Sequence, residues 1–300
     1  MAAMTAPRSF QVSPEQAGQR LDRFLRTALA GLSRRALWER FAAGDVSVNG
    51  RIAAKSAALQ AGDRVEVSGL AAHLGPAADA ELALRVIYED AWLVAVDKPG
   101  HVPSHALRDG EAGTVVSALL ARYPEMRTVG YRALEAGLLH RLDNETSGIL
   151  LAARDADTFE RVRSAHERGQ IEKRYLALVA GQPQPQRVRG YLRADRRKVR
   201  VRAEPFPEAK PVELEIVSSE PHADRALVCV RLQLAARHQV RAQLAALGHP
   251  IAGDTLYGGP SVPGLSRHFL HASELRLQHP RHGTALALEA PLPDALRALL

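Results

Sequence analysis

The stretch "HRLDNETSG", residues 140–148, places charged and polar residues between two apolar runs, "AGLL" before it and "ILLAAR" after it. The apolar runs are typical of buried strands. A turn between two strands needs only part of this set, because Asp or Asn starts a turn by bonding its own backbone and Ser-Gly completes it. Taken alone, Asp143 is better explained as a turn former than as a reactive group, so the rest of the chain has to decide.

The composition indicates a globular protein with enough apolar residues for a full core. The chain has 300 residues, of which 46% are hydrophobic and 24% charged, and this length is natural for two domains. It contains no run of 18 apolar residues and its N-terminus lacks an apolar signal core, so we expect neither a membrane span nor secretion. The single cysteine, Cys229, favours a cytoplasmic location and is expected to fill the core.

The charge balance favours a polyanionic partner without establishing one. The chain has 40 Lys and Arg against 33 Asp and Glu, a net charge of +7. Arg forms a planar fork that matches phosphate oxygens, but many basic proteins bind no nucleic acid. Charge alone therefore leaves an RNA partner open.

Residues 1–69 are expected to form a small domain of two helices, a hairpin and a strand. Apolar spacing predicts helices near 19–32 and 33–44, the second capped by Ser33, and Asn49-Gly50 is a strong hairpin turn signal. Residues 1–70 carry ten Lys or Arg and six Asp or Glu, so 10 − 6 = +4. Arg34 and Arg35 on the second helix form either a solvated face or a phosphate-contacting face, and the pattern does not separate the two.

The Ala-rich segment 70–84 is a predicted linker, and 85–300 is predicted to be one mixed α+β domain. A helix is expected within 155–169, with a capping box formed by Asp157 and Glu160. Strands are expected to dominate from about 171 to 235, and they include the basic hairpin "RVRGYLRADRRKVRVR" at 187–202.

Three further stretches bear on the role of Asp143. In "EKRYLALVAG", Tyr175 is either a core aromatic or a ring that stacks on an extruded base. In "ARHQVRAQLAALGHPIAGDTLYG", 236–258, a helix ending at Gly248 places His238 and Arg241 three residues apart, so both side chains point the same way. In "VAVDKPGHVPSH", 94–105, a buried strand runs into a turn beside Lys98.

Together these motifs resemble the RluA-type pseudouridine synthases. "DKPG", "HRLDNETSG", "KRY", "HQVRAQL" with "GHPIAGDTLYG", and "FLHASEL" with His279-Pro280 occur in the order seen in that family. The small domain, through "LSRR" and "VSVNG", resembles the RNA-binding domain named after ribosomal protein S-four, an arrangement found in the RluC and RluD members. The resemblance implies a mainly antiparallel-sheet catalytic domain behind a small α/β RNA-binding domain.

The resemblance also implies the reaction. Pseudouridine synthases detach uracil from its ribose, turn it and rejoin it through carbon five, with no cofactor and no metal. Asp143 would be the nucleophile or the essential anion, Arg241 its partner in a bidentate pair, and Tyr175 the stacking ring and a candidate proton acceptor. Expected RNA contacts are Arg141, Thr146, His238, Arg34 and Arg35. The expected substrate is 23S-type ribosomal RNA, bound by a monomer.

The sequence departs from the family at one point. The family usually has "TGRxHQ" before the helix, and here "LAARHQ", 234–239, replaces it. This departure is the one feature that favours a rival hypothesis, a non-catalytic RNA-binding or ribosome-assembly protein on the same fold. A synthase acting on transfer RNA is the second alternative. A hydrolase is disfavoured because "TSGI" is not a nucleophile elbow, and a metal enzyme because the histidines lack ligand spacing.

Overall fold

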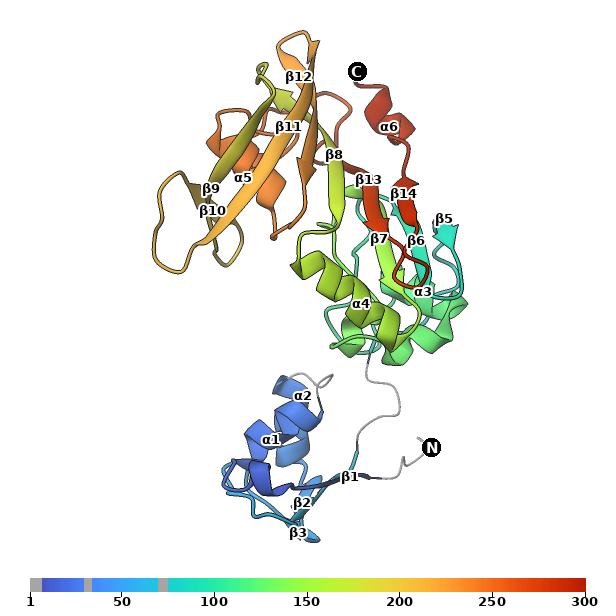
Figure 1. The fold of residues 1–300 in the computed structure, drawn as a ribbon, viewed down its shortest axis with the longest axis vertical. Helices are drawn as coiled ribbons and strands as arrows, with labels where there is room; N and C mark the ends of the chain where they lie inside the picture. Colours follow the sequence, from blue (N-terminus) through green and yellow to red (C-terminus); the bar gives the residue numbers. More distant parts are fainter. Residues whose placement is uncertain (1–6, 30–33, 70–74) are drawn as a thin grey trace.

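The computed structural model describes residues 7–29, 34–69 and 75–300, without the side chains of 34–36. Two separate sheets, one of four strands and one of ten, organise these residues (Figure 1). The predicted cap at Ser33 lies outside the described residues. No helix in the described ranges is both long and apolar enough to cross a membrane.

The small sheet confirms the helix, helix, hairpin and strand order, and adds an N-terminal strand. Its strands follow the order β1-β4-β2-β3, all antiparallel. Leu21, Phe24 and Leu25 on the first helix pack with Val65 and Val67 of the last strand. The elements are β1 (Arg8–Gln11), η1 (Pro14–Gln16), α1 (Leu21–Ala28), α2 (Arg34–Ala42), β2 (Val46–Val48), β3 (Arg51–Ile52) and β4 (Arg64–Val67).

The large sheet confirms a mixed, mainly antiparallel architecture. Its order is β10-β9-β11-β12-β8-β13-β7-β6-β5, with β14 paired to β13, and only β13 and β7 run parallel. The strands are β5 (Arg85–Glu89), β6 (Leu93–Lys98), β7 (Ser147–Ala153), β8 (Glu172–Ala180), β9 (Gln186–Ala194), β10 (Val199–Arg202), β11 (Lys210–His222), β12 (Arg225–Leu232), β13 (Leu270–Gln278) and β14 (Ala285–Glu289). Strands dominate 171–235 as predicted, and β9 and β10 form the basic hairpin.

Two helices cover opposite faces of the β6–β7 region. Because alternate side chains of a strand point to opposite faces, Val94 and Val96 pack with α3 (Val115–Arg122), whereas Leu93 and Ala95 pack with Phe159 of α4 (Ala156–Glu167). Short 3₁₀ helices, η2 (Pro124–Thr128) and η3 (Ala133–Glu135), lead into the loop before β7.

The start of α4 corrects the predicted capping box. Asp155, not Asp157, is the N-cap, and its carboxylate accepts hydrogen bonds from the backbone N–H and the hydroxyl of Thr158. Both aspartates lie at the start of this helix, and composition alone did not choose between them. The predicted position was two residues too late.

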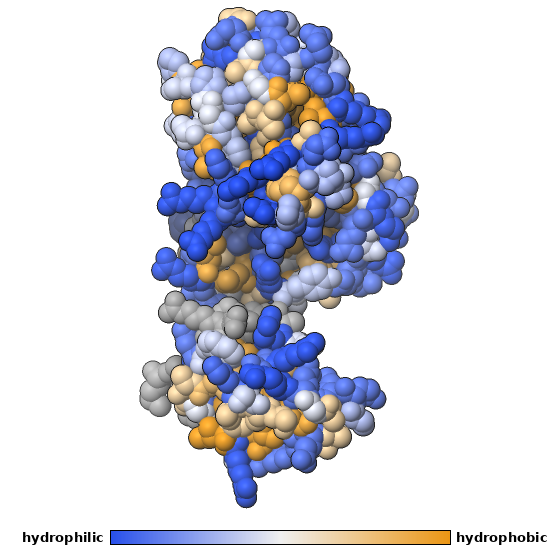
Figure 2. All heavy atoms as spheres, turned by 90° about the vertical axis from the view of Figure 1, so that its left-hand side faces the viewer, coloured by the Kyte–Doolittle hydropathy of each residue, from blue (hydrophilic) through white to orange (hydrophobic). Residues whose placement is uncertain are grey.

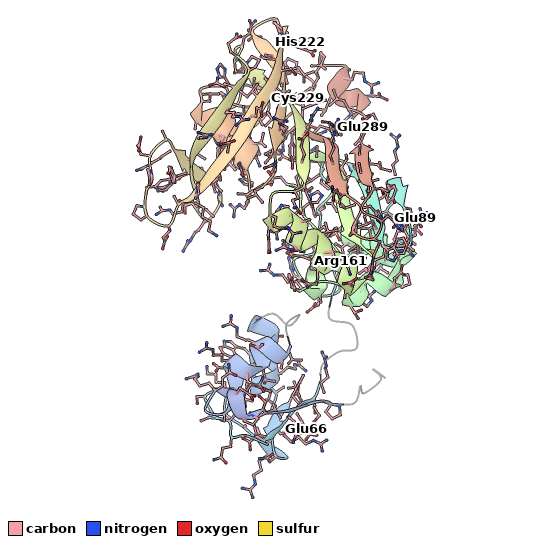
Figure 3. The ribbon with its side chains drawn as sticks, viewed as in Figure 1. Glu66, Glu89, Arg161, His222, Cys229 and Glu289 are labelled. Atoms are coloured by element: carbon pink, nitrogen blue, oxygen red, sulfur yellow. The ribbon has the colours of Figure 1, made fainter. Side chains whose placement is uncertain are left out.

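Strand β12 corrects the expectation for Cys229. The core cluster that includes α5 (Gln239–Ala246) contains four residues of β12: Ala226, Val228, Val230 and Leu232. Cys229 lies on the opposite, partly exposed face of the strand (Figure 3). Burial raises the pKa of the Cys229 thiol, which keeps it protonated. The cysteine is not the predicted core residue, but the expectation that it is no thiolate agrees with its surroundings.

The half of the sheet that contains β12 carries α5, η4 (Thr255–Tyr257) and α6 (Asp294–Arg297). Val240 and Leu244 of α5 belong to the core cluster with β8, β11, β12 and β13. In Figure 1, α5 lies to the left of β8 and α4 lies below the lower end of this strand.

Residues 75–84, the second part of the predicted linker, have no helix or strand but are hydrogen-bonded to α3 and to the loop before it. Gly75 donates its N–H to Asp109, and the N–H of Asp79 donates to the carbonyl of Ser117. The limits of the two domains stay predictions from the sequence.

Glycine is required at the end of the opening motif because β7 and β13 meet there without room for a side chain. Gly148 has φ +112°, and a Cβ on it would lie 2.2 Å from the carbonyl oxygen of Ala272. The parallel pairing of β7 with β13 therefore depends on this residue.

We expect Gly148→Ala to lower the free energy of unfolding by about 3 kcal/mol or more, because strain and a backbone collision add. Gly283→Ala is the matched control, since Gly283 also has positive φ (+69°) but open space around it, and it should cost about 1 kcal/mol. Denaturant unfolding of both variants measures the difference. Equal destabilisation of the two variants would show that the backbone of β13 shifts to accommodate a side chain at position 148.

Candidate active site

A cavity of about 1110 Å³ opens between the 140–146 loop, β8, α4 and α5. It is lined by apolar and charged side chains together, including Asp143, Tyr175 and Arg241. Figure 2 shows the side of the molecule that lies at the left in Figure 1, where hydrophilic side chains predominate between scattered apolar ones.

The register of the central strands brings the predicted residues to one place. Ala272 of β13 pairs with Tyr175 of β8 on one side and with Gly148 of β7 on the other. The loop that carries Asp143 ends where β7 begins, so Asp143 lies close to the row that contains Tyr175. Three segments that are distant in sequence thus supply one wall of the cavity.

Asp143 and Arg241 contact each other, but not in the predicted bidentate pair. Arg241 donates from Nη1 to Oδ2 of Asp143 at 2.8 Å. Its Nε and Nη2 donate to the two oxygens of Asp254, at 2.7 and 2.8 Å. The bidentate partner is therefore Asp254, whose side chain is 1% exposed, and Asp143 receives the remaining arm of the fork.

Two carboxylates keep the Arg241 guanidinium charged inside the protein. Burial acts to lower the pKa of Arg241, but the hydrogen bonds that it donates to Asp254 and Asp143 outweigh burial and raise the pKa. The guanidinium also lies 5.3 Å from the centre of the Tyr257 ring. The result is a fixed cation against one side of the Asp143 carboxylate.

His238 lies on the other side of Asp143, with Nε2 3.7 Å from Oδ1. The backbone N–H of Val199 donates to the Tyr257 hydroxyl at 2.8 Å, and that hydroxyl lies 3.1 Å from Nδ1 of His238. In the tautomer in which the Tyr257 hydroxyl donates to Nδ1, the ring proton is on Nε2 and faces the acceptor Oδ1 of Asp143. Burial lowers the pKa of His238, so the ring is neutral and directs an N–H toward Asp143.

Tyr175 is buried and its side chain lines the cavity. Burial, followed by the negative charge of Asp143, raises the pKa of the Tyr175 phenol. The hydroxyl therefore stays protonated at neutral pH and is a hydrogen-bond donor in the free protein.

A buried lysine, Lys98, contacts the backbone of the loop that carries Asp143. Lys98 is completely buried, and its ammonium donates to the carbonyl oxygens of Pro99, Val102 and Asn144 at 2.7 to 2.9 Å. Burial and the nearby Arg267 lower the pKa of Lys98 to about 7, whereas three carbonyl acceptors favour the ammonium form. This contact joins the "DKPG" turn to the residue after Asp143.

Of the other predicted RNA contacts, Thr146 and Arg141 line the cavity. Thr146 is buried, lines the cavity and shares a 2.8 Å hydrogen bond with Nε2 of His268. Arg141 lies at the cavity and pairs with Glu135 at 2.8 Å. Arg34 and Arg35 begin α2, but their side chains lie outside the described residues. Within the ranges that the structure describes, no group of His, Cys, Asp and Glu is arranged to hold a metal ion.

Comparisons with known proteins identify the family to which the chain belongs. The family model described as RNA pseudouridylate synthase matches residues 92–246, which contain Asp143, Tyr175 and Arg241. The ribosomal large subunit pseudouridine synthase C of Escherichia coli K12 is 32% identical over 96% of this chain and 94% of its own. The chain belongs to the RNA pseudouridylate synthase family. It is thus an RNA pseudouridine synthase, an isomerase, as the resemblance implied.

Further relatives cover the same length. The ribosomal large subunit pseudouridine synthase D of Nitrosomonas europaea is 32% identical over 95% of this chain and 84% of its own. The solved structure of human RNA pseudouridylate synthase domain containing 4 has a TM-score of 0.55 at 23% identity, covers 72% of this chain and 92% of its own, and shows the shared fold.

Sequence reasoning did not find the residues that hold this synthase's site together. Asp254 and Tyr257 lie in "GHPIAGDTLYG", a motif of the resemblance in which neither residue was given a role, and Lys98 was interpreted as a turn neighbour. An Asp and a Tyr inside a Gly-rich loop are a weak signal, because the same residues are common in plain turns. Their partners are distant in sequence, so spacing does not reveal them.

We expect Asp254→Asn to lower the free energy of unfolding by about 3 kcal/mol, because a buried guanidinium then loses one of its two carboxylates. Asp294→Asn is the control: Asp294 also pairs with an arginine, at 3.0 Å, but is 96% exposed, and its loss should leave stability unchanged. Denaturant unfolding compares them. A stable Asp254→Asn protein would mean that Asp143 alone satisfies Arg241.

Proposed function

We propose that Asp143 is the carboxylate on which pseudouridine formation depends in this chain. In the reaction the bond between N1 of uracil and C1′ of ribose breaks, the base turns, and a bond forms between C5 and C1′. C5 loses its proton and N1 gains one, so the net change is an isomerisation. A carboxylate that is held in place, and whose anion is stabilised by a cation, can act at C1′ or at the base.

The observation that carries the proposal is the single hydrogen bond from Arg241 to Oδ2 of Asp143. It leaves Oδ1 facing the neutral His238 ring and the cavity, with the Asp143 side chain 23% exposed. Arg241 acts by fixing the position of the carboxylate and by placing a cation beside its oxygen. The carboxylate keeps an oxygen free for the substrate.

Tyr175 and His238 are proposed to contact the extruded uridine. Extrusion exposes both faces of the base, and a buried aromatic ring at the cavity wall offers a stacking partner. The protonated phenol of Tyr175 would first donate a hydrogen bond, and it could accept a proton only while passing its own to another group. His238 would offer Nε2–H to a substrate oxygen, and Thr146 would act through His268 by supporting the loop.

The departure "LAARHQ" leaves these residues in place. Ala235 and Ala236 line the cavity, and Arg237 lies next to the β9–β10 turn, where its Nη2 donates to the carbonyl oxygens of Asp195 and Arg196 at 3.3 Å. Arg237 thereby joins the basic hairpin to the start of α5. The missing family residues are expected to alter RNA contacts more than chemistry.

We propose large-subunit ribosomal RNA as the substrate. The names of the synthase C and synthase D relatives support this, as does the net charge of +4 over residues 1–70, which include the small domain. Arg34, Arg35 and Arg141 are proposed contacts to RNA phosphates. The monomeric state and the cytoplasmic location stay predictions from the sequence.

Asp143→Asn is expected to lower pseudouridine formation by at least about 10³-fold, because the amide keeps the shape but loses the anion. The measurement is pseudouridine mapping, by chemical adduct and reverse transcription, in cells that lack the gene and carry either wild type or variant. One ribosomal site or several should vanish on deletion and return only with wild type.

Asp224→Asn is the control for this experiment, because Asp224 is an exposed aspartate on the β11–β12 turn and should restore modification fully. Restoration by Asp143→Asn would refute the role of the carboxylate. Sites that vanish from transfer RNA instead of ribosomal RNA would refute the substrate and leave the chemistry intact.

Tyr175→Phe keeps the ring and removes the hydroxyl, so we expect kcat to fall about 10²-fold or more while KM for RNA stays within about threefold. Tyr175→Leu removes the ring as well and should also raise KM. Single-turnover kinetics on a ribosomal RNA transcript separate the two effects. An unchanged rate in Tyr175→Phe would limit this residue to stacking.

A further inference from the structure

The wall of the cavity formed by β8 and α4 contains a buried cation that pairs with none of the described residues. Lys173 precedes Tyr175 by two residues on β8, so both side chains point to the same face, and both line the cavity. Lys173 is 4% exposed, and its cross-strand neighbours are the apolar Leu232 and Leu275. Among the residues that the structure describes, its ammonium makes no hydrogen bond and no ion pair.

Other basic side chains surround it. Arg163 and His166 of α4 and His140 of the loop line the same part of the cavity. The Nε of Arg163 is buried and has no hydrogen-bond partner within the described residues, whereas its Nη2 pairs with Glu167 at 3.5 Å on the outer side of α4. Burial, with Lys173 and Arg163 nearby, lowers the pKa of His166 to about 4, so the histidine gives up its proton in the free protein.

This crowding reflects a missing negative charge. Burial, then Arg163, lowers the pKa of Lys173 to about 8, which still leaves the ammonium mostly charged at neutral pH. A buried charge without a partner costs stability. An anion entering the cavity would remove that cost and relieve the repulsion among the cations.

Arg174, the next residue on β8, differs from Lys173 in having carboxylate partners. Arg174 points to the opposite face and pairs with Glu172 at 2.9 Å and with Glu274 at 3.3 Å. The strand thus provides carboxylates on the face away from the cavity and none beside Lys173. The lack of a partner is confined to the side that faces the cavity.

We propose that Lys173, with Arg163 at its side, forms a subsite that binds a backbone phosphate of the RNA next to the extruded uridine. The inference rests on the proposed function, since the same cavity holds Asp143 and Tyr175. A phosphodiester fits better than a base edge, because two neighbouring cations balance a full negative charge, whereas a uracil carbonyl supplies only a dipole.

The test measures RNA binding without turnover. Lys173→Met keeps the apolar stem and removes the charge, and it is made in the Asp143→Asn background. Arg174→Met is the matched control with the same change in net charge, and Lys173→Arg retains the cation. The probe is a large-subunit ribosomal RNA transcript, titrated over a range of salt concentrations, with thermal unfolding of each variant measured in parallel.

Lys173→Met should weaken RNA binding about tenfold and reduce the slope of log affinity against log salt by about 1. It should also raise the melting temperature, because an uncompensated buried charge has gone. Arg174→Met should change affinity less than twofold, and Lys173→Arg should retain it. Ethylation of one phosphate close to the target uridine should impair binding by the Lys173 form and lose its effect in Lys173→Met.

Two results would overturn the subsite. One is unchanged affinity and salt dependence in Lys173→Met. The other is a lower melting temperature together with weaker binding, which would show that the lysine supports the fold. Both are separate from the proposed catalytic role, because Asp143→Asn tests that role through pseudouridine formation and these measurements record binding alone.

Discussion

The site depends on how one guanidinium is divided between two carboxylates. Asp254 takes two arms of Arg241 and Asp143 takes one. Arg241 and Asp254 are both buried, and each depends on the other. Removing one partner would leave an uncompensated buried charge, which destabilises the protein. Asp143 therefore meets a cation whose position is already fixed by a different residue. It can then contact substrate without giving up the structure that orients it.

The fold brings these groups together because segments that are distant in sequence lie beside the central strands of the large sheet. Asp143 precedes β7, Arg241 lies on α5 after β12, and Asp254 follows in the loop before β13. The parallel pairing of β7 with β13 at Gly148 fixes the end of the loop that carries Asp143. At the end of β6, Lys98 donates a hydrogen bond to the carbonyl oxygen of Asn144 in the same loop. The loop is thus fixed by the strand pairing at its end and by the Lys98 side chain, independently of RNA.

The motif order in the sequence was enough to predict the mixed antiparallel fold, and the contact between Asp143 and Arg241 followed from the family resemblance. The bidentate geometry was wrong, because a pattern shows which residues are present and not how a five-donor guanidinium is shared. Cys229 was placed on the wrong face, since an apolar stretch such as "ALVCVRL" does not show which alternate set is buried. Lys98 and Asp254 were missed for a related reason: the value of a buried charge depends on partners that only tertiary structure supplies.

Two parts of the cavity differ in their charge balance, and this difference bears on how RNA would enter. Around Arg241 two carboxylates meet one guanidinium and a neutral histidine, so that end is not short of negative charge. Around Lys173 and Arg163 the cations exceed their partners. The cations in excess of their partners attract a polyanion to the second region. On the proposal made above, the phosphate would bind on the α4 side and leave only the uncharged base and ribose to approach Asp143, so charge would orient the nucleotide before stacking on Tyr175 begins.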